Sequence, residues 1–503
     1  MLQATDIPLI NRAKEDLERT TIIATEGVFT YRHLLHASGQ VATCILDAAD
    51  DLQEQRVAFL IPPGFHYVAT QWGVWRAGGV AVPLCVSHPR PELEYVIEDS
   101  GATIAIAHPN FETMLRPVAQ ARGLRFILTT EMLNAAESAL PEVGINRRAM
   151  ILYTSGTTSK PKGVVTTHQN IQAQVTSLIS AWGWTSEDRI LHVLPLHHIH
   201  GIINVLTCSL WAGAKCEMLT KFDAQTVWAR IIEGNLTLFM AVPTVYTKLI
   251  TAWEAAPPDR QKAMSAACAK MRLMVSGSAA LPVLVLEKWN TISGHFLLER
   301  YGMTEIGMAL SNPLGGQRLP GYVGTPLPNV EVRLDELGNL VEPRTPGEIQ
   351  VKGPGVFLEY WGKPEATEKA FRDGWFCTGD IAVFENGSYR ILGRSSVDII
   401  KTGGYKVSAL EIEEVLRNHV DIQECTVVGV ADSEWGERVC AALVLKEESS
   451  LTLEALRSWA KDRLAVYKIP TAILVLDDLP RMLGTILTAH SFWTSDVGLT
   501  ETN

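Results

Sequence analysis

A run of small, hydroxylated and basic residues, YTSGTTSKPKG, occupies positions 153–163. Hydroxyl and ammonium groups donate hydrogen bonds to anions, and a glycine lets the backbone approach a phosphate closely. The run differs from the P-loop pattern G-x-x-x-x-G-K-[ST], because Pro161 separates its two lysines and no Ser or Thr follows a Gly-Lys pair. Taken alone, the run is equally consistent with a phosphate-binding loop and with a polar turn.

Three further segments carry residues that could act on the same ligand. They are Tyr301-Gly-Met-Thr-Glu305, Thr378-Gly-Asp380, and Gly393-Arg394 with Asp398 and Lys401-Thr-Gly-Gly-Tyr-Lys406. Each has a structural alternative when taken singly. Tyr301 could be a core aromatic residue, Glu305 a surface carboxylate and Arg394 a member of a surface ion pair.

The composition indicates a folded protein of two or more domains. The chain has 503 residues, of which 47% are hydrophobic and 20% charged. Its net charge of −11 argues against a general binder of nucleic acids or anionic membranes, but it allows a local pocket for a small anion. Eight cysteines without a C-x-x-C pair are typical of a reducing compartment and predict neither a disulfide framework nor a zinc site.

The sequence predicts no membrane span, because its most apolar stretches are interrupted by Pro, Gly or Arg. The first residues lack the apolar core of a signal peptide, and early acids such as Asp6 and Glu15 are unusual in a transit peptide. We expect a soluble protein of the cytoplasm, or of mitochondria if a targeting segment is missing from this chain. The residues do not predict an oligomeric state.

Short apolar runs alternate with amphipathic segments of helix length, and this pattern predicts an α/β fold with mainly parallel sheets. The expected buried strands are 57–61, 104–107, 126–128, 150–153, 238–242 and 273–275. Ligands of such sheets bind beyond the carboxyl ends of the strands, and the 153–163 run directly follows one of these ends.

The predicted domains are a large one, residues 1–395, and a small C-terminal α+β domain, residues 396–503. Gly, Pro and alternating residues from about 320 to 395 predict a smaller antiparallel β-rich subdomain within the large domain. Ser408-Ala-Leu-Glu411 is the capping box of a helix in the small domain. Ser395-Ser396 is the predicted hinge.

These segments stand in the order and spacing of the adenylate-forming (ANL) superfamily, and the chain resembles acyl-CoA synthetases from about residue 20 to 481. The stretches 194–201, 272–282 and 298–305 resemble the malonyl-CoA synthetase branch. The resemblance implies a large AMP-binding domain and a small mobile one. It also implies that a carboxylate attacks the α-phosphorus of ATP, and that the thiol of coenzyme A then displaces AMP. The expected ligands are the acid, ATP, Mg²⁺ and coenzyme A, with no nucleic acid.

At matching positions, the resemblance implies individual roles. Thr304 is expected to contact the α-phosphate and Glu305 to hold Mg²⁺, and with His200 they form the expected catalytic set. The expected ATP- and AMP-binding residues are Thr154, Ser155, Gly156, Thr157, Thr158, Ser159, Lys160, Pro161, Lys162, Ser276, Gly277, Ser278, Tyr301, Thr304, Asp380 and Arg394. The expected thiolation surface for coenzyme A is Lys401, Gly403, Gly404, Tyr405 and Lys406.

A dicarboxylic acid differs from a fatty acid by a second carboxylate, which costs several kcal/mol if it is buried unpaired. Arg272, directly before a buried strand, is the predicted counter-charge, although it could equally cap that strand at the surface. His200, Ser278 and Met303 complete the predicted acid site. The resemblance implies malonate, with methylmalonate as a further candidate. His197, His198 and His200 lack Cys or carboxylate partners in the local sequence, so no zinc site is predicted there.

The C-terminal end departs from the family pattern after Arg481. The family's last motif reads roughly L-P-R-x-x-x-G-K, and the resemblance implies that its lysine reaches the α-phosphate and the substrate carboxylate. Here Gly484-Thr485 replaces the Gly-Lys pair, and no lysine follows Lys468. Loss of one charged donor typically costs about 10²–10³-fold in rate. The sequence therefore predicts impaired adenylation with a retained thiolation surface.

Three functions remain open from the sequence. The first is a malonyl-CoA synthetase-type ligase with weakened adenylation. The second keeps the fold but activates a medium-chain fatty acid or an aryl acid. The third is a pseudoenzyme that binds a nucleotide or an acyl-adenylate as a regulator, and the missing lysine is its only support.

Overall fold

The computed structural model describes residues 7–136, 138–154, 160–336, 338–395, 398–402, 405–432 and 435–479, and the backbone of 481–482 and 485–486. The chain divides into two compact units, residues 1–332 with 351–376 and residues 333–350 with 377–503. The predicted domain boundary at residue 395 stays a prediction.

Two sheets build the first unit, and their parallel central strands confirm the predicted α/β fold. One sheet has the order β15-β14-β13-β12-β11-β9-β10-β1-β2. Its strands are β1 Thr20–Ala24, β2 Gly27–Thr30, β9 Arg189–His192, β10 Lys215–Met218, β11 Leu238–Ala241, β12 Leu273–Ser276, β13 Leu298–Met303, β14 Gly307–Ser311 and β15 Thr325–Pro326. The other has the order β19-β8-β7-β4-β3-β5-β6. Its strands are β3 Arg56–Leu60, β4 Val80–Pro83, β5 Ile104–Ala107, β6 Arg125–Leu128, β7 Arg148–Thr154, β8 Lys162–Thr167 and β19 Glu359–Tyr360.

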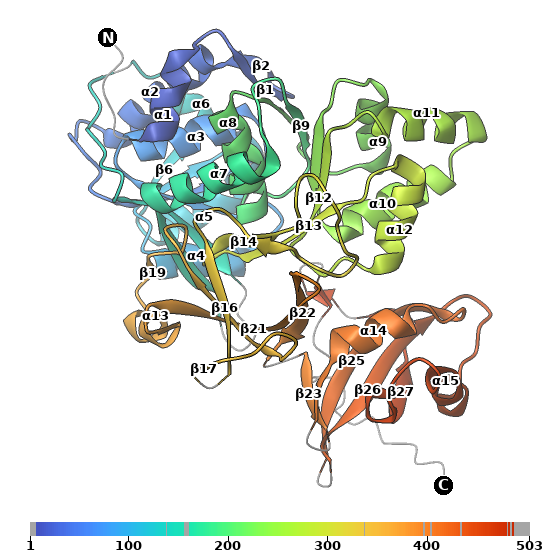
Figure 1. Cartoon of the computed structure of the whole chain (residues 1–503). Helices are drawn as coiled ribbons and strands as arrows, with labels where there is room; N and C mark the ends of the chain where they lie inside the picture. The colour runs from blue at the N-terminus through green and yellow to red at the C-terminus, as the bar shows by residue number, and fades with distance from the viewer. Residues whose placement is uncertain are drawn as a thin grey trace. The chain divides into compact units, whose positions relative to one another are not determined.

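Helices cover these sheets because both faces of the central strands are apolar. In β11, Leu238 and Met240 contact a core that includes residues of both sheets, whereas Phe239 packs on the opposite face with the residues of α9 to α12. Figure 1 shows α9 to α12 grouped beside β12 and β13. The helices are α1 Pro8–Glu15, α2 Tyr31–Leu46, α3 Phe65–Arg76, α4 Arg90–Ser100, α5 Glu112–Ala121, α6 Thr129–Met132, α7 His168–Trp182, α8 Cys208–Ala212, α9 Ala224–Ile232, α10 Pro243–Glu254, α11 Pro258–Cys268, α12 Val283–Ser293 and α13 Pro364–Lys369.

The second unit is built mainly from antiparallel strands, with one parallel pair, β26 and β27, and its described residues include the helices α14 and α15. A β-rich part contains β17 Asn339–Leu340, β22 Ser388–Arg394 and most of β16 Glu331–Glu336, β18 Gly347–Lys352 and β21 Trp375–Glu385. β20 Phe371–Arg372 pairs with Trp375 and Phe376, which belong to the first unit as β20 does. The remainder contains β23 Ile399–Thr402, β24 Tyr405–Ser408, α14 Ala409–Leu416, β25 Ile422–Asp432, β26 Gly436–Leu445, α15 Leu453–Ala460, β27 Ala472–Val475, β28 Arg481–Met482 and β29 Thr485–Ile486. Ser408 caps α14 by accepting a hydrogen bond from the Glu411 backbone N–H, which is one of the two hydrogen bonds of the predicted capping box.

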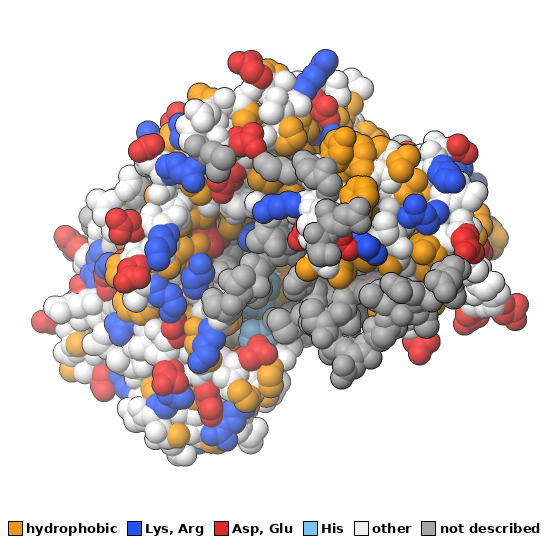
Figure 2. All heavy atoms as spheres, turned by 90° about the horizontal axis from the view of Figure 1, so that it is seen from below, with side chains coloured by type: hydrophobic (Ala, Val, Ile, Leu, Met, Phe, Trp, Pro, Cys, Tyr) orange, Lys and Arg blue, Asp and Glu red, His pale blue; other side chains and the backbone are white. Residues whose placement is uncertain are grey.

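The surface mixes charges of both signs. Figure 2 shows lysine and arginine side chains interspersed with aspartate and glutamate over the face seen there. Within the described ranges, no helix has the length and apolar character that crossing a membrane requires.

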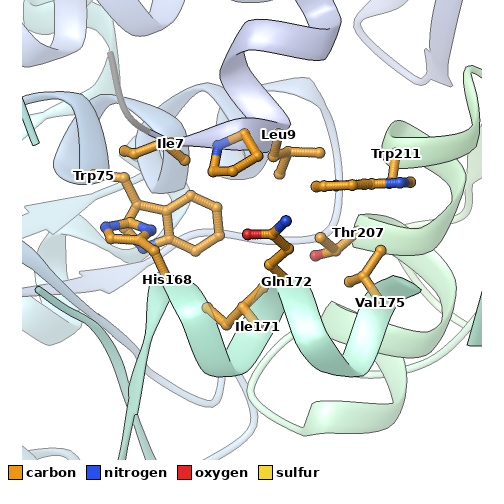
Figure 3. A pocket seen from close by; sticks show the side chains of 10 residues that line it. Ile7, Leu9, Trp75, His168, Ile171, Gln172, Val175, Thr207 and Trp211 are labelled. Atoms are coloured by element: carbon orange, nitrogen blue, oxygen red, sulfur yellow. The ribbon is translucent and has the colours of Figure 1, made fainter. Parts of the chain in front are cut away.

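A cavity of about 20 Å³ lies among α1, α3, α7 and α8 of the first unit, with room for one water molecule. His168 opens α7 and lines this cavity together with Trp75, as Figure 3 shows. The two rings meet edge to face, with 5.6 Å between their centroids. Burial lowers the pKa of His168 to about 3, so this imidazole is neutral at physiological pH.

The buried histidines make stability depend on pH. Burial also lowers the pKa of His192, at the end of β9, to about 4, against about 6.5 in an unfolded chain. Below pH 6.5 the unfolded chain therefore binds more protons than the folded one, and each such histidine removes up to about 1.4 kcal/mol of stability per pH unit until its folded pKa is reached.

We expect His192→Gln to reduce this loss between pH 6 and pH 5 by about 1 kcal/mol. The measurement is the free energy of unfolding in denaturant at both pH values. The same substitution at the exposed His36, His36→Gln, is the control. An equal loss in His192→Gln would contradict the assignment.

Candidate active site

The 153–163 run forms a hairpin between two strands. β7 and β8 pair antiparallel, with Thr154 opposite Lys162, and α7 begins only after β8. The predicted residues Ser155, Gly156, Thr157, Thr158 and Ser159 lie outside the described residues. Of the run, the structure describes Thr154 at the end of β7, Lys162 opposite it at the start of β8, and Lys160 and Pro161 directly before β8.

Aromatic rings hold both lysines of this hairpin. The Lys160 ammonium lies 5.4 Å from the centroid of the Tyr95 ring, and the Tyr95 hydroxyl donates to the Pro161 carbonyl at 2.6 Å. The Lys162 ammonium lies 4.3 Å from the centroid of the Tyr360 ring. Cation–π contacts of this kind position an ammonium without neutralising its charge. Both charges are therefore available to an anionic ligand.

Tyr360 also joins the hairpin to the turn after β13. Its hydroxyl donates to Glu305 Oε1 at 2.8 Å, and the Phe357 backbone donates to the Glu305 carbonyl at 2.7 Å. Glu305 is 5% exposed. A buried carboxylate oriented in this way fits a hard cation such as Mg²⁺, which prefers oxygen ligands. Thr304 precedes Glu305 in the turn and is partly buried.

The carboxyl ends of β9, β12 and β13 meet at one edge of the sheet, because these strands run parallel. The predicted residues Ser276, Gly277 and Ser278 follow or end β12, and Tyr301 and Met303 lie in β13. Ser276 is fully buried, and no described residue forms a hydrogen bond with its hydroxyl. Tyr301 and Met303 are partly buried.

A buried arginine that the sequence interpretation did not single out lies at this edge. Arg300, in β13, is 4% exposed, and its Nη2 donates to Ser278 Oγ at 3.2 Å. Its Nε has no hydrogen-bond partner among the residues that the structure describes, and burial lowers the pKa of Arg300 to about 9. Among the described residues, no carboxylate forms an ion pair with it. Gly277 packs against the guanidinium so closely that a Cβ there would lie 2.5 Å from Arg300 Nε.

His200 completes a chain of polar groups with Ser278 and Arg300. Its Nδ1 lies 3.2 Å from Ser278 Oγ, and within the described part of the chain its Nε2 has no hydrogen-bond partner. The imidazole is 4% exposed, and burial together with the nearby Arg300 charge lowers the pKa of His200 well below its usual value. His200 is therefore neutral and can donate one hydrogen bond. It opens a π-helical segment, His200–Thr207, a conformation that is frequent at functional sites.

Arg272 lies away from this group. It precedes β12, whereas Ser276 and Ser278 lie at the other end of that strand. Its Nε and Nη2 donate to the buried Asp188 carboxylate at 3.1 and 2.9 Å, and its Nη1 donates to the Trp182 carbonyl. The guanidinium is thus a structural partner of Asp188. This agrees with the alternative interpretation of Arg272, in which it stabilises the start of its strand. Arg300 therefore replaces Arg272 as the candidate counter-charge for the second carboxylate of the substrate.

In the second unit, Asp380 and Arg394 lie side by side on β21 and β22. They pair in register, and Arg394 Nε lies 3.0 Å from Asp380 Oδ1. The Arg394 backbone donates to Asp398 Oδ2 at 2.9 Å. The ion pair that was the structural alternative for Arg394 is therefore present, and it brings the two predicted nucleotide ligands together. Of the predicted hinge, Ser395 donates its backbone N–H to Gly379, and Ser396 lies outside the described residues.

The predicted thiolation surface is a hairpin. β23 and β24 pair antiparallel, with Lys401 opposite Lys406, and the Lys401 backbone donates to Glu437. Tyr405 is 54% exposed and stacks on Tyr467, with 4.2 Å between the ring centroids. The predicted Gly403 and Gly404, the side chain of Lys406, and Gly484 in the atypical last motif lie outside the described residues.

The sequence interpretation missed two residues of the site, and only one of them carried a signal in the sequence. Arg300 is a charged residue in the buried first half of β13, Leu298–Met303, and a charge in a buried strand requires a partner. Tyr360 carried no comparable signal, because its contact with Glu305 joins residues that are distant in the sequence.

Comparison with known proteins agrees with this arrangement. The family model for AMP-binding enzymes matches residues 9–361, and that for their C-terminal domain matches residues 411–483. The mitochondrial malonate–CoA ligase of Homo sapiens is 47% identical over 514 residues, covering 94% of this chain and 89% of its own. The ATP-bound structure of MatB from Rhodopseudomonas palustris is 32% identical, with a TM-score of 0.88, and covers 97% of this chain and 98% of its own. A malonyl-CoA ligase complex with methylmalonyl-CoA and AMP is 35% identical, with a TM-score of 0.68, and covers 92% of this chain and 97% of its own.

Arg272→Ala should destabilise the fold without disturbing the site. Removing the guanidinium leaves the buried Asp188 carboxylate with fewer partners, which costs about 1–3 kcal/mol. Chemical unfolding measures this loss of stability. The rate of thioester formation from malonyl-adenylate should change less than about twofold, which is less than the loss of a contact with the ligand would cause. Loss of thioester formation in a folded Arg272→Ala protein would instead indicate that Arg272 binds the substrate carboxylate.

Proposed function

Because the chain belongs to the AMP-binding enzyme family, we propose that it is an acid–thiol ligase that joins malonate to coenzyme A. The proposed reaction passes through malonyl-adenylate and releases pyrophosphate and AMP. Malonate as the acid is supported by the names of the relatives and by one feature of the site, the buried Arg300. Methylmalonate carries the same second carboxylate and is a further candidate.

Arg300 is the residue that favours a dicarboxylic acid as the substrate. A buried guanidinium without a counter-charge destabilises a fold by several kcal/mol. The distal carboxylate of a dicarboxylic acid supplies that counter-charge, with the Ser278 hydroxyl and the His200 imidazole beside it as further donors. A medium-chain fatty acid or an aryl acid would leave the guanidinium unpaired, so this alternative is disfavoured.

In the first step, two anions must be brought together, so catalysis depends on positive charge and oriented donors. Thr154, Lys160 and Lys162 would bind the β- and γ-phosphates, and Thr304 the α-phosphate. Glu305 would hold Mg²⁺, which neutralises phosphate charge when bound. Tyr360 would keep this carboxylate oriented through its 2.8 Å hydrogen bond.

The remaining roles concern the nucleoside and coenzyme A. We assign the adenine to Tyr301 and the backbone after Ser276, and the ribose hydroxyls to Asp380 with Arg394 beside it. The hairpin that contains Lys401 and Tyr405 would border the pantetheine arm in the second step, after movement at the 395–396 hinge. Likeness to the human relative supports mitochondria as the compartment.

Thr485, in place of the family's last lysine, supports a second function, that of a protein which binds the adenylate but forms it slowly. Thioester formation from synthetic malonyl-adenylate and coenzyme A should therefore be faster than from malonate, ATP and coenzyme A.

Thr485→Lys should raise the rate from malonate and ATP by about 10²-fold, because it restores one charged donor. Single-turnover assays measure both routes, and Thr485→Gln is the uncharged control. Equal, fast rates by the two routes in the unchanged protein would contradict impaired adenylation. Absence of product by both routes would favour the pseudoenzyme.

Arg300→Gln should lower thioester formation from malonyl-adenylate by about 10²-fold or more, because the distal carboxylate then lacks its charge partner. The rate from butyryl-adenylate, which has no second carboxylate, should change little. The preference for malonyl over butyryl is the quantity to measure, and Arg272→Lys is the control arginine variant. An unchanged preference in Arg300→Gln would refute the proposed acid site.

A further inference from the structure

A cysteine and two histidines gather where loops of the two sheets of the first unit meet. Cys85 and His88 follow β4 of one sheet, and His197 follows β9 of the other. The thiol sulfur and one ring nitrogen of each imidazole all lie within 4.8 Å of one another. His197 has no cysteine neighbour in the sequence, and the fold supplies one.

We propose that Cys85, His88 and His197 form a binding site for a divalent transition-metal ion of the zinc type. Thiolate sulfur and imidazole nitrogen are the ligands that zinc prefers. Tetrahedral zinc holds them at about 2.0–2.3 Å, which places the ligand atoms roughly 3.5 Å apart. Small side-chain rotations bring the three atoms to that spacing, and a water molecule takes the fourth position, as in three-ligand zinc sites.

The surroundings orient the three ligands. Glu92 Oε2 lies 3.1 Å from His88 Nδ1, which leaves Nε2 of His88 for the metal. A carboxylate that binds the second nitrogen of a ligand histidine is typical of metal sites and strengthens the ligand. The rings of His88 and His197 lie 5.6 Å apart at 60°, so they can converge on one ion rather than stack. Ser87 Oγ lies 3.1 Å from Cys85 Sγ.

Exposure allows an ion to enter. Cys85 is 4% exposed, whereas 18% of the His88 side chain is exposed and His197 is partly buried. The sulfur is thus protected while the imidazoles border solvent. This nitrogen and sulfur set also differs from the oxygen ligand that Glu305 offers, so the two sites select different metals.

An ion at this site would tie the two sheets together beside the acid site. His197 lies in the segment that Tyr67 and His192 fasten through the carbonyls of Leu196 and Gly201. The same segment leads to His200. Metal binding should therefore stabilise the first unit.

The test is a titration of the full chain with Zn²⁺ against a chromophoric chelator, without ATP or acid, so that it does not depend on ligase activity. We expect one ion per chain with a dissociation constant of about 1 μM or below, within the range of three-ligand protein sites. Cys85→Ser and His197→Gln should each weaken binding at least about tenfold, and Glu92→Gln about tenfold. Cys44→Ser is the matched cysteine control and should bind as the unchanged protein does.

Two further readouts keep the result unambiguous. Co²⁺ should give a thiolate-to-metal charge-transfer band that Cys85→Ser lacks, and Zn²⁺ should raise the thermal midpoint of the unchanged protein but not of Cys85→Ser. Circular dichroism checks that each variant is folded. If Cys85→Ser does not fold, the affinity of Glu92→Gln for Zn²⁺ tests the proposal in its place. Equal affinity in all variants, or no binding by the folded unchanged protein, would overturn the proposal.

Discussion

The guanidinium of Arg300 sets the constraint on which the acid site depends. It is almost completely buried, and Gly277 packs against it with no room for a side chain. The protein supplies a serine hydroxyl but, among the described residues, no carboxylate. Because a charge removed from water must be compensated, the natural partner is an anion that arrives with the substrate. The neutral His200 beside it adds a donor without adding a second positive charge.

The sheets explain why this charge can be held at all. Apolar residues on both faces of β11 and β12 fix these strands between helices. Together with the parallel neighbour β13 they place Ser278, Arg300 and the turn with Glu305 along one edge. Tyr360 then connects Glu305 to Lys162 of the hairpin. Acid-binding and phosphate-binding groups are thus positioned by one rigid framework, which suits a reaction between two anions.

Much of this framework could be predicted from the sequence. The six predicted strands appear as β3, β5, β6, β7, β11 and β12, because continuous apolar runs have few other ways to be buried. The acid site was predicted less well. Arg272 precedes a buried strand and Arg300 lies within one. Only the fold shows that Arg272 pairs with Asp188, while Arg300 has no carboxylate partner among the described residues. The cluster of Cys85, His88 and His197 was not predicted for the same reason, because its residues follow strands of two different sheets.

The most direct test of the account is a crystal structure of the protein with a non-hydrolysable malonyl-adenylate analogue. The account predicts that the distal carboxylate accepts hydrogen bonds from the Arg300 guanidinium, with Ser278 and His200 beside it, while Arg272 remains paired with Asp188. A distal carboxylate that points to solvent or binds Arg272, with Arg300 still unpaired, would contradict it.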